Sequence, residues 1–170
     1  MSPMEVDLSR LNRNRAMLGA GASALLILSL LFLPWYDLTD NPQRAAGDPA
    51  TFICGTGEYS CTGFETFPIM RWLLLAAASA PLILAWILVR GHTLSWAPGE
   101  LTMVVGFTAF VLVAYNGIVD RPGSQIAEAG VGLDYGYWLA LLAAAGMSAT
   151  GIMRAMESGG RQQRKTPGTV

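Results

Sequence analysis

Four long stretches that are nearly free of charged residues constrain this chain more than any other feature of its sequence. They cover Ala16–Leu33, Trp72–Val89, Leu101–Val119 and Tyr137–Met153. As helices with a rise of about 1.5 Å per residue, they would be about 26–29 Å long, close to the roughly 30 Å hydrocarbon core of a bilayer. Because lipid offers no partners to backbone N–H and C=O groups, each stretch is predicted to be a helix.

The composition supports a membrane protein. Charged residues make up 14% of the sequence and hydrophobic residues 52%, whereas a soluble domain carries about 25% charged residues. We therefore expect an all-α membrane protein, a four-transmembrane-helix bundle with a small disulfide-pinned outer loop. Its predicted parts are an N-terminal segment 1–15, helices at about 16–34, 70–90, 99–119 and 136–155, an outer loop 35–69 and a tail 156–170. Both polar ends are expected to be poorly ordered.

The basic residues are unevenly distributed along the chain. Of eleven Lys and Arg residues, eight fall on one side of four crossings, and Arg44, Arg71 and Arg121 fall on the other. The positive-inside rule then predicts a multi-pass plasma-membrane protein with both termini in the cytoplasm. The basic start and first apolar stretch could instead be a cleaved signal peptide, but the apolar run is long for one and no small-residue cleavage site follows it directly. We expect it to be retained as a spanning helix.

Aromatic residues gather at the predicted helix ends. The first helix runs into LPWYD, where a hydrocarbon stretch changes abruptly to polar sequence. Rings that carry one polar atom are typical of the membrane–water interface. The predicted interfacial anchors are Trp35, Tyr36, Trp72 and Trp138 at the outer ends and Trp96 toward the inner face.

The two cysteines, Cys54 and Cys61, enclose six residues of the first outer loop. On the outer face a disulfide is the default expectation, and the β-prone residues around it predict a small β-hairpin near Gly55–Gly57. Two alternatives remain open. Thiol–disulfide exchange would make the pair catalytic, although quinone-coupled membrane oxidoreductases normally use a second pair. A metal site would need two further ligands.

Small residues recur at every fourth position of the predicted helices. The longest such stripe, in the fourth helix, consists of Gly136, Ala140, Ala144 and Ser148. Stripes of this kind let helix backbones approach closely in lipid. The stripe is predicted to pack within the bundle, with a homodimer or partner face as the alternative. Asn116 near the outer end of the third helix is predicted to form an interhelix hydrogen bond.

The sequence carries little sign of chemistry. It contains no Gly-rich phosphate loop, HExxH motif or nucleophile elbow, and its net charge of −1 gives no case for a nucleic-acid partner. The single histidine, His92, lies in the predicted inner loop. We expect no catalytic residues, no metal and no cofactor.

Several short motifs resemble those of small, uncharacterised four-helix membrane proteins from high-GC actinobacteria. They are LFLPWY closing the first helix, GFETF before the second, DRPG after the third and GYWLALLAAAG opening the fourth. The resemblance covers the chain from about Leu18 to Arg154 and implies a topology rather than an activity. The layout of four helices with a first-loop cysteine pair is also similar to claudin-like proteins, whose Trp–Leu-Trp–Cys signature is missing here.

Three functional hypotheses follow from these patterns. The first is a non-enzymatic scaffold or accessory subunit of a larger membrane complex, whose partners are the lipid bilayer and other membrane subunits or a second copy of itself. The second is a binder or carrier of a lipid or another small apolar ligand. The third is a thiol-redox membrane enzyme that uses Cys54 and Cys61.

Overall fold

The computed structural model describes residues 3–38, 60–91, 98–122 and 131–162. Its helices are α1 (Pro3–Phe32), α3 (Gly63–Thr66), α4 (Met70–Val89), α5 (Pro98–Ala114), the π-helical turn η1 (Tyr115–Val119) and α6 (Tyr135–Gln162). Its strands are β1 (Pro34–Leu38), β2 (Ser60–Thr62) and β3 (Val131–Leu133).

Four helical segments are long and apolar enough to cross a membrane. They are Asn14–Phe32, Met70–Val89, Gly99–Val119 and Tyr135–Glu157. Their lengths of 19 to 23 residues correspond to about 28–35 Å of helix, enough for the hydrocarbon core. The prediction of four helices long and apolar enough to span a membrane is therefore confirmed within the described residues.

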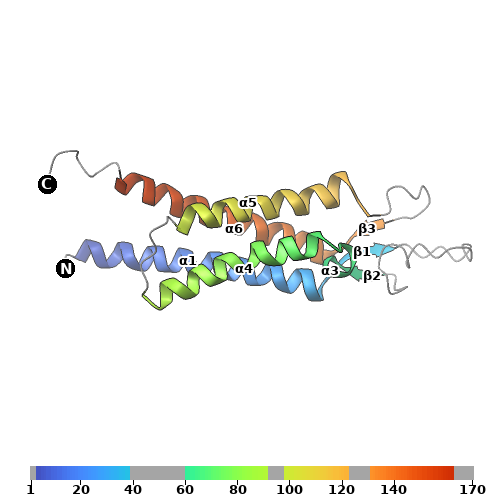
Figure 1. The fold of residues 1–170 in the computed structure, drawn as a ribbon, viewed down its shortest axis with the longest axis horizontal. Coiled ribbons are helices and arrows are strands. Elements are labelled where there is room, and N and C mark those ends of the chain that lie inside the picture. Colours follow the sequence, from blue (N-terminus) through green and yellow to red (C-terminus); the bar gives the residue numbers. More distant parts are fainter. Residues whose placement is uncertain (1–2, 39–59, 92–97, 123–130, 163–170) are drawn as a thin grey trace, which may run out of the picture.

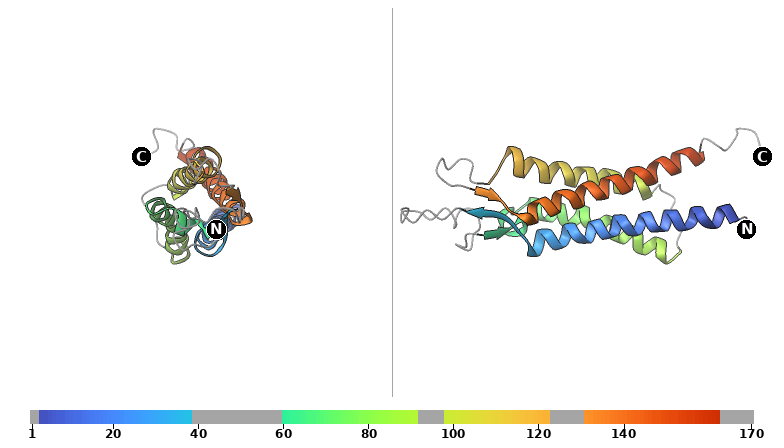
Figure 2. Two further views of the ribbon diagram at one scale, coloured as in Figure 1. Left: turned by 90° about the vertical axis from the view of Figure 1, so that its right-hand side faces the viewer. Right: turned by 180° about the vertical axis from the view of Figure 1, so that it is seen from behind.

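The four long helices lie side by side along one axis, and successive spans run in opposite directions (Figure 1). In the resulting ring α1 contacts α4 and α6, and α5 contacts α4 and α6, with α5 and α6 packed most extensively. The chain termini lie at one end of the bundle and the three strands at the other (Figures 1 and 2). These two ends are named the termini end and the sheet end below.

Glycines set the close approach of α5 and α6. A Cβ added at Gly106 would lie 2.7 Å from the Ser148 backbone nitrogen, and one added at Gly151 would overlap the Met103 backbone nitrogen. Small residues at such contacts let backbones meet where lipid provides no hydrophobic drive between helices. The two helices therefore meet backbone to backbone rather than through long side chains.

A three-stranded antiparallel sheet closes the sheet end, in the order β2-β1-β3. Its central strand is β1, the PWYDL segment that directly follows α1. Tyr36 pairs with Cys61 of β2 on one side and with Leu133 of β3 on the other. The sheet thus joins both segments that connect spanning helices at this end.

A β-bulge at Trp35 orients two successive rings inward. The register with β2 passes from Pro34↔Thr62 directly to Tyr36↔Cys61, so Trp35 is the extra residue. Successive side chains of a regular strand point to opposite faces, and a bulge re-aims one of them. As a result, Trp35 and Tyr36 are both fully buried.

Both polar ends of the chain are more helical than we expected. Helix α1 begins at Pro3, where a proline is favoured because its φ is preset and its missing N–H has no helical partner to lose. Helix α6 continues through Gly159 and Gly160 to Gln162. In both cases residues are added to an existing helix, which is far easier than nucleating one.

The predicted hairpin near Gly55–Gly57 lies outside the described residues. The described strand nearest to it in sequence, β2, pairs with β1. The partner of this strand is therefore the segment that directly follows the first spanning helix, which local sequence patterns did not indicate.

Candidate functional site

An apolar groove lies between α1 and α6 on the lateral surface of the described bundle. It has a volume of about 520 Å³. Its lining consists of Met17, Leu18, Gly21, Ala22 and Leu25 from α1 and Leu139, Leu142 and Ala143 from α6. The lining contains no polar side chain, and several of its long side chains are more than half exposed. The groove therefore opens toward the surface that would face lipid.

The packing of the described bundle does not require a glycine at position 21 of α1. Of the eleven glycines whose surroundings the structure describes, nine have another atom within 4 Å of the position that a Cβ would take, while Gly21 and Gly91 face open space. Gly91 has a φ of +76°, which favours glycine for backbone reasons. Gly21 is helical and exposed, where glycine costs about 1 kcal/mol relative to alanine.

The opposite face of α1 is fixed firmly to the bundle. Ser23 donates a hydrogen bond to the Ala78 carbonyl of α4. Ser29 donates to the Gly136 carbonyl of α6 over 2.5 Å. Both serines are fully buried, so these bonds set the rotation of α1 about its axis. That rotation leaves Leu18, Gly21 and Leu25 on the exposed side.

An ion pair joins the same two helices at the termini end. The guanidinium of Arg15 contacts the carboxylate of Glu157. Their side chains are 31% and 35% exposed, so the pair contributes at most about 1 kcal/mol. Its larger consequence is that Arg15 is neutralised within the chain. The exposed polar residue at this level of α1 is then the uncharged Asn14.

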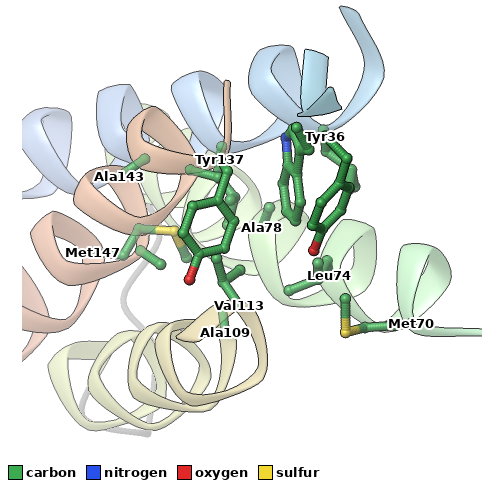
Figure 3. Close-up of a cluster of buried hydrophobic side chains, with 14 of the residues drawn as sticks. Tyr36, Met70, Leu74, Ala78, Ala109, Val113, Tyr137, Ala143 and Met147 are labelled. Carbon is green, nitrogen blue, oxygen red and sulfur yellow. The ribbon is translucent and has the colours of Figure 1, made fainter. Parts of the chain in front are cut away.

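Aromatic side chains fill the interior at the sheet end. Trp35 and Tyr137 are fully buried and meet edge to face, with ring centroids 6.0 Å apart. The Trp35 indole N–H donates to the Ser29 carbonyl over 3.0 Å. Figure 3 shows Tyr36 and Tyr137 inside the bundle, near Leu74, Ala78 and Val113.

Side chains also complete the end of η1. The last carbonyls of a helix have no intrahelical partner. Tyr36 donates its hydroxyl to the Asn116 carbonyl over 3.2 Å, and Arg121 donates Nε–H to the Gly117 carbonyl over 2.7 Å. Tyr36 and Arg121 are best explained as a structural cap, because both donate to carbonyls at the end of η1.

We expect the stability of the protein to fall above pH 10 partly through Tyr36. Burial raises the pKa of its phenol above the ordinary value of about 10. The unfolded chain therefore loses this proton first as pH rises, so the stabilisation is complete below pH 10 and is lost above it. Measured by alkaline unfolding, the stability of the Tyr36→Phe variant should fall less steeply above pH 10 than that of the parent, and equal slopes would contradict this prediction.

The small-residue stripe of α6 lies in the interior. Gly136, Ala140, Ala144 and Ser148 are all buried. Gly136 contacts the chain at Leu33 and Pro34, and Ser148 faces Gly106 of α5. The stripe is used within this chain, so the alternative of a homodimer or partner face on these four residues is not supported.

The aromatic anchors divide into two groups. Trp35 and Tyr36 are fully buried within the protein, so neither ring is exposed to headgroups, and their depth in a membrane stays a prediction. Trp72 and Trp138 are 59% and 51% exposed, and their interfacial role stays a prediction. Trp96 lies outside the described residues.

The remaining predicted residues are only partly described. Cys61 is buried in β2, and Cys54 lies outside the described residues, so their disulfide stays a prediction. Asn116 donates to Met70 Sδ of α4 over 3.0 Å, which confirms its interhelix hydrogen bond. His92 is not described. Within the described ranges, no group of three or more His, Cys, Asp or Glu side chains is placed to hold a metal ion.

The chain matches no protein-family model, and no similar curated protein or solved structure was found. The groove therefore has to be interpreted from its own geometry. Sequence reasoning missed it, although one signal was present: Gly21 lies among the small residues Gly19, Ala20 and Ala22. Which of these faces a neighbour depends on the rotation of α1, which Ser23 and Ser29 set.

Proposed function

We propose that this protein is a non-enzymatic membrane protein that receives a further membrane-spanning helix in the α1/α6 groove and so acts as a scaffold or accessory subunit. The observation that carries the proposal is Gly21, which lies in the groove and where an added Cβ would meet nothing within 4 Å. An acyl chain adapts its shape to any apolar surface, whereas a helix backbone approaches closely only at small residues. A glycine at this position therefore favours a helix as the occupant.

The groove can be tested by filling it. In the Gly21→Leu variant, the new side chain should occupy the groove without touching the bundle, because the space beside Gly21 is open. We expect the amount of co-purifying membrane subunits in mild detergent to fall about tenfold or more. A tenfold fall is equivalent to about 1.4 kcal/mol of binding free energy. The measurement is quantitative mass spectrometry of tagged protein.

A matched control for this variant is available on α4. Ala76 is exposed on that helix and does not line the groove, so Ala76→Leu adds a similar side chain elsewhere on the lateral surface. It should leave co-purification unchanged, and neither variant should lower the thermal unfolding temperature of the parent, since replacing a helical glycine raises helix propensity. Equal recovery of partners with Gly21→Leu and the parent protein would contradict the proposal.

A lipid or small apolar ligand is the second candidate occupant. It is favoured by the purely apolar lining and by a volume of about 520 Å³, which lies within the range of ligand pockets. The thiol-redox hypothesis is weaker, since exchange requires access to the sulfur atoms and Cys61 is 1% exposed.

The location and orientation are part of this proposal. We propose a plasma-membrane protein with both termini in the cytoplasm, supported by the excess of Lys and Arg at the termini end and by the position of both termini at one end of the bundle (Figure 1). The sheet end would then face outward. A Cys54–Cys61 disulfide is proposed on that side, where oxidising conditions favour it.

A further inference from the structure

We infer that the helix received by the groove is α1 of a second copy of this chain, so that the protein forms a symmetric dimer through α1. The inference rests on the proposed function, because it names the occupant of the same groove. It concerns the exposed residues named here the α1 seam: Asn14, Leu18, Gly21, Leu25 and Leu28.

The membrane restricts how two copies can meet. Copies inserted with the same orientation run parallel, so a two-fold axis along the membrane normal places each residue opposite its own counterpart. In such a dimer, Gly21 of one copy lies near Gly21 of the other at the point of closest approach. The two smallest side chains then meet where the backbones must come closest.

The spacing of the α1 seam fits two parallel helices. Its members follow one another at alternating steps of four and three residues, the spacing by which side chains of one helix fit between those of another. Leu18 is 65% exposed and Leu25 is 45% exposed, on either side of Gly21. They are placed to contact the partner's Gly21 region and the α6 wall of its groove.

The described residues at the start of the α1 seam also suit a second copy. In a symmetric dimer, an exposed arginine on the seam side would approach its own counterpart and repel it. Arg15 is instead held by Glu157 of the same chain, and the seam carries Asn14 at this level. An asparagine amide has both donors and an acceptor, so two Asn14 side chains can bond each other reciprocally. A polar Asn of this kind is a known device for specifying a parallel pair.

Cysteine cross-linking in native membranes tests the arrangement. Leu18→Cys and Leu25→Cys should give disulfide-linked dimers on mild oxidation. Ile83→Cys on α4, 56% exposed and outside the groove, is the matched control, and the parent protein measures any background from Cys54 and Cys61. We expect at least about tenfold more dimer from the seam positions. Equal yields from the seam and from α4 would overturn the inference.

Substitution of Asn14 gives a second measurement that does not depend on cross-linking. Asn14→Ala should weaken dimerisation about threefold to thirtyfold, the range measured for interhelix hydrogen bonds in membranes, while Asn14→Gln should retain most of it. Förster transfer between labelled copies in vesicles reports the dissociation constant. No change with Asn14→Ala would contradict the reciprocal amide contact.

The Gly21→Leu variant separates failure of this inference from failure of the proposed function. Loss of both dimer and seam cross-links in Gly21→Leu supports the dimer. If the parent protein is a monomer, and a different membrane subunit that co-purifies with it is lost in the Gly21→Leu variant, the dimer is overturned but helix docking stands. If the parent protein is a monomer and only bound lipid is lost in the Gly21→Leu variant, the dimer and helix docking are both overturned in favour of the apolar-ligand alternative.

Discussion

Replacing Trp35 with alanine should lower the free energy of unfolding by about 3–5 kcal/mol, the usual cost of truncating a large buried aromatic side chain. Trp35 is fully buried and packs edge to face on Tyr137. Gly63 at the start of α3 lies so close that a Cβ there would be 2.6 Å from the Trp35 ring. Removal of the ring therefore leaves a cavity bordered by α1, α3 and α6 together.

Truncating Trp35 to alanine should also remove a buried hydrogen-bond donor, the indole N–H. The Trp35 indole N–H is shared between the carbonyl and the hydroxyl of Ser29, and this hydroxyl donates to the Gly136 carbonyl. Breaking this chain loosens the junction between α1 and α6, so more than packing is lost. The Trp35→Phe variant, which keeps a ring but lacks the N–H donor, should fall between the parent and alanine.

Equilibrium unfolding in mixed micelles, followed by circular dichroism, measures this effect. The matched control is Trp138→Ala at the same end of the bundle, since Trp138 is 51% exposed and contacts Tyr137 with ring centroids 5.4 Å apart. An aromatic pair of this kind is worth about 0.5–1.5 kcal/mol, so the control should stay within that range. Similar losses for the two tryptophans would show that Trp35 is not part of the core.

The burial of Trp35 and Tyr36 shows where sequence reasoning stopped. Both the membrane interface and a protein interior accept a ring that carries one hydrogen-bonding atom. The LPWYD segment fits either environment when read alone. Burial is decided by β2 and β3, which are distant in sequence, and by a bulge that aims both rings inward. Local pattern could not supply those contacts.

The spanning helices were predictable for the opposite reason. A run of apolar residues long enough to cross a membrane must satisfy its own backbone hydrogen bonds, so helix formation there depends on local sequence alone. The stripe from Gly136 to Ser148 was visible for the same reason. Its use inside the chain was decided by α1, where Ser29 donates to the Gly136 carbonyl, and by α5, where Gly106 meets Ser148.

The candidate groove depends on a single rotation that the sequence did not reveal. Gly19 and Gly21 are two residues apart, about 200° around a helix. Gly19 faces Thr150, where an added Cβ would lie 3.0 Å from the threonine hydroxyl, whereas Gly21 faces open space. The composition does not distinguish the two glycines. The hydrogen bonds of Ser23 and Ser29 fix the rotation of α1, so that Gly19 packs inside the bundle and Gly21 faces outward.

Replacing Gly151 with alanine should destabilise the bundle by about 1–3 kcal/mol or more, the cost of inserting a methyl group into a fully packed contact. A Cβ at Gly151 would overlap the backbone of Met103 and lie 2.8 Å from the Thr102 carbonyl carbon. These are backbone atoms of α5, so a rotamer change cannot make room. The two helices would have to separate, which also disturbs the contact between Gly106 and Ser148.

Gly146 on the same helix provides the control for this substitution. A Cβ there would lie 3.5 Å from the Ala22 Cβ, which is an ordinary van der Waals contact. Gly146→Ala should therefore be neutral or should stabilise by up to about 1 kcal/mol through helix propensity. Thermal unfolding of both variants in one detergent gives the comparison. If Gly151→Ala unfolds at the same temperature as Gly146→Ala, α5 and α6 do not meet backbone to backbone, and the close contact that organises this half of the bundle is absent.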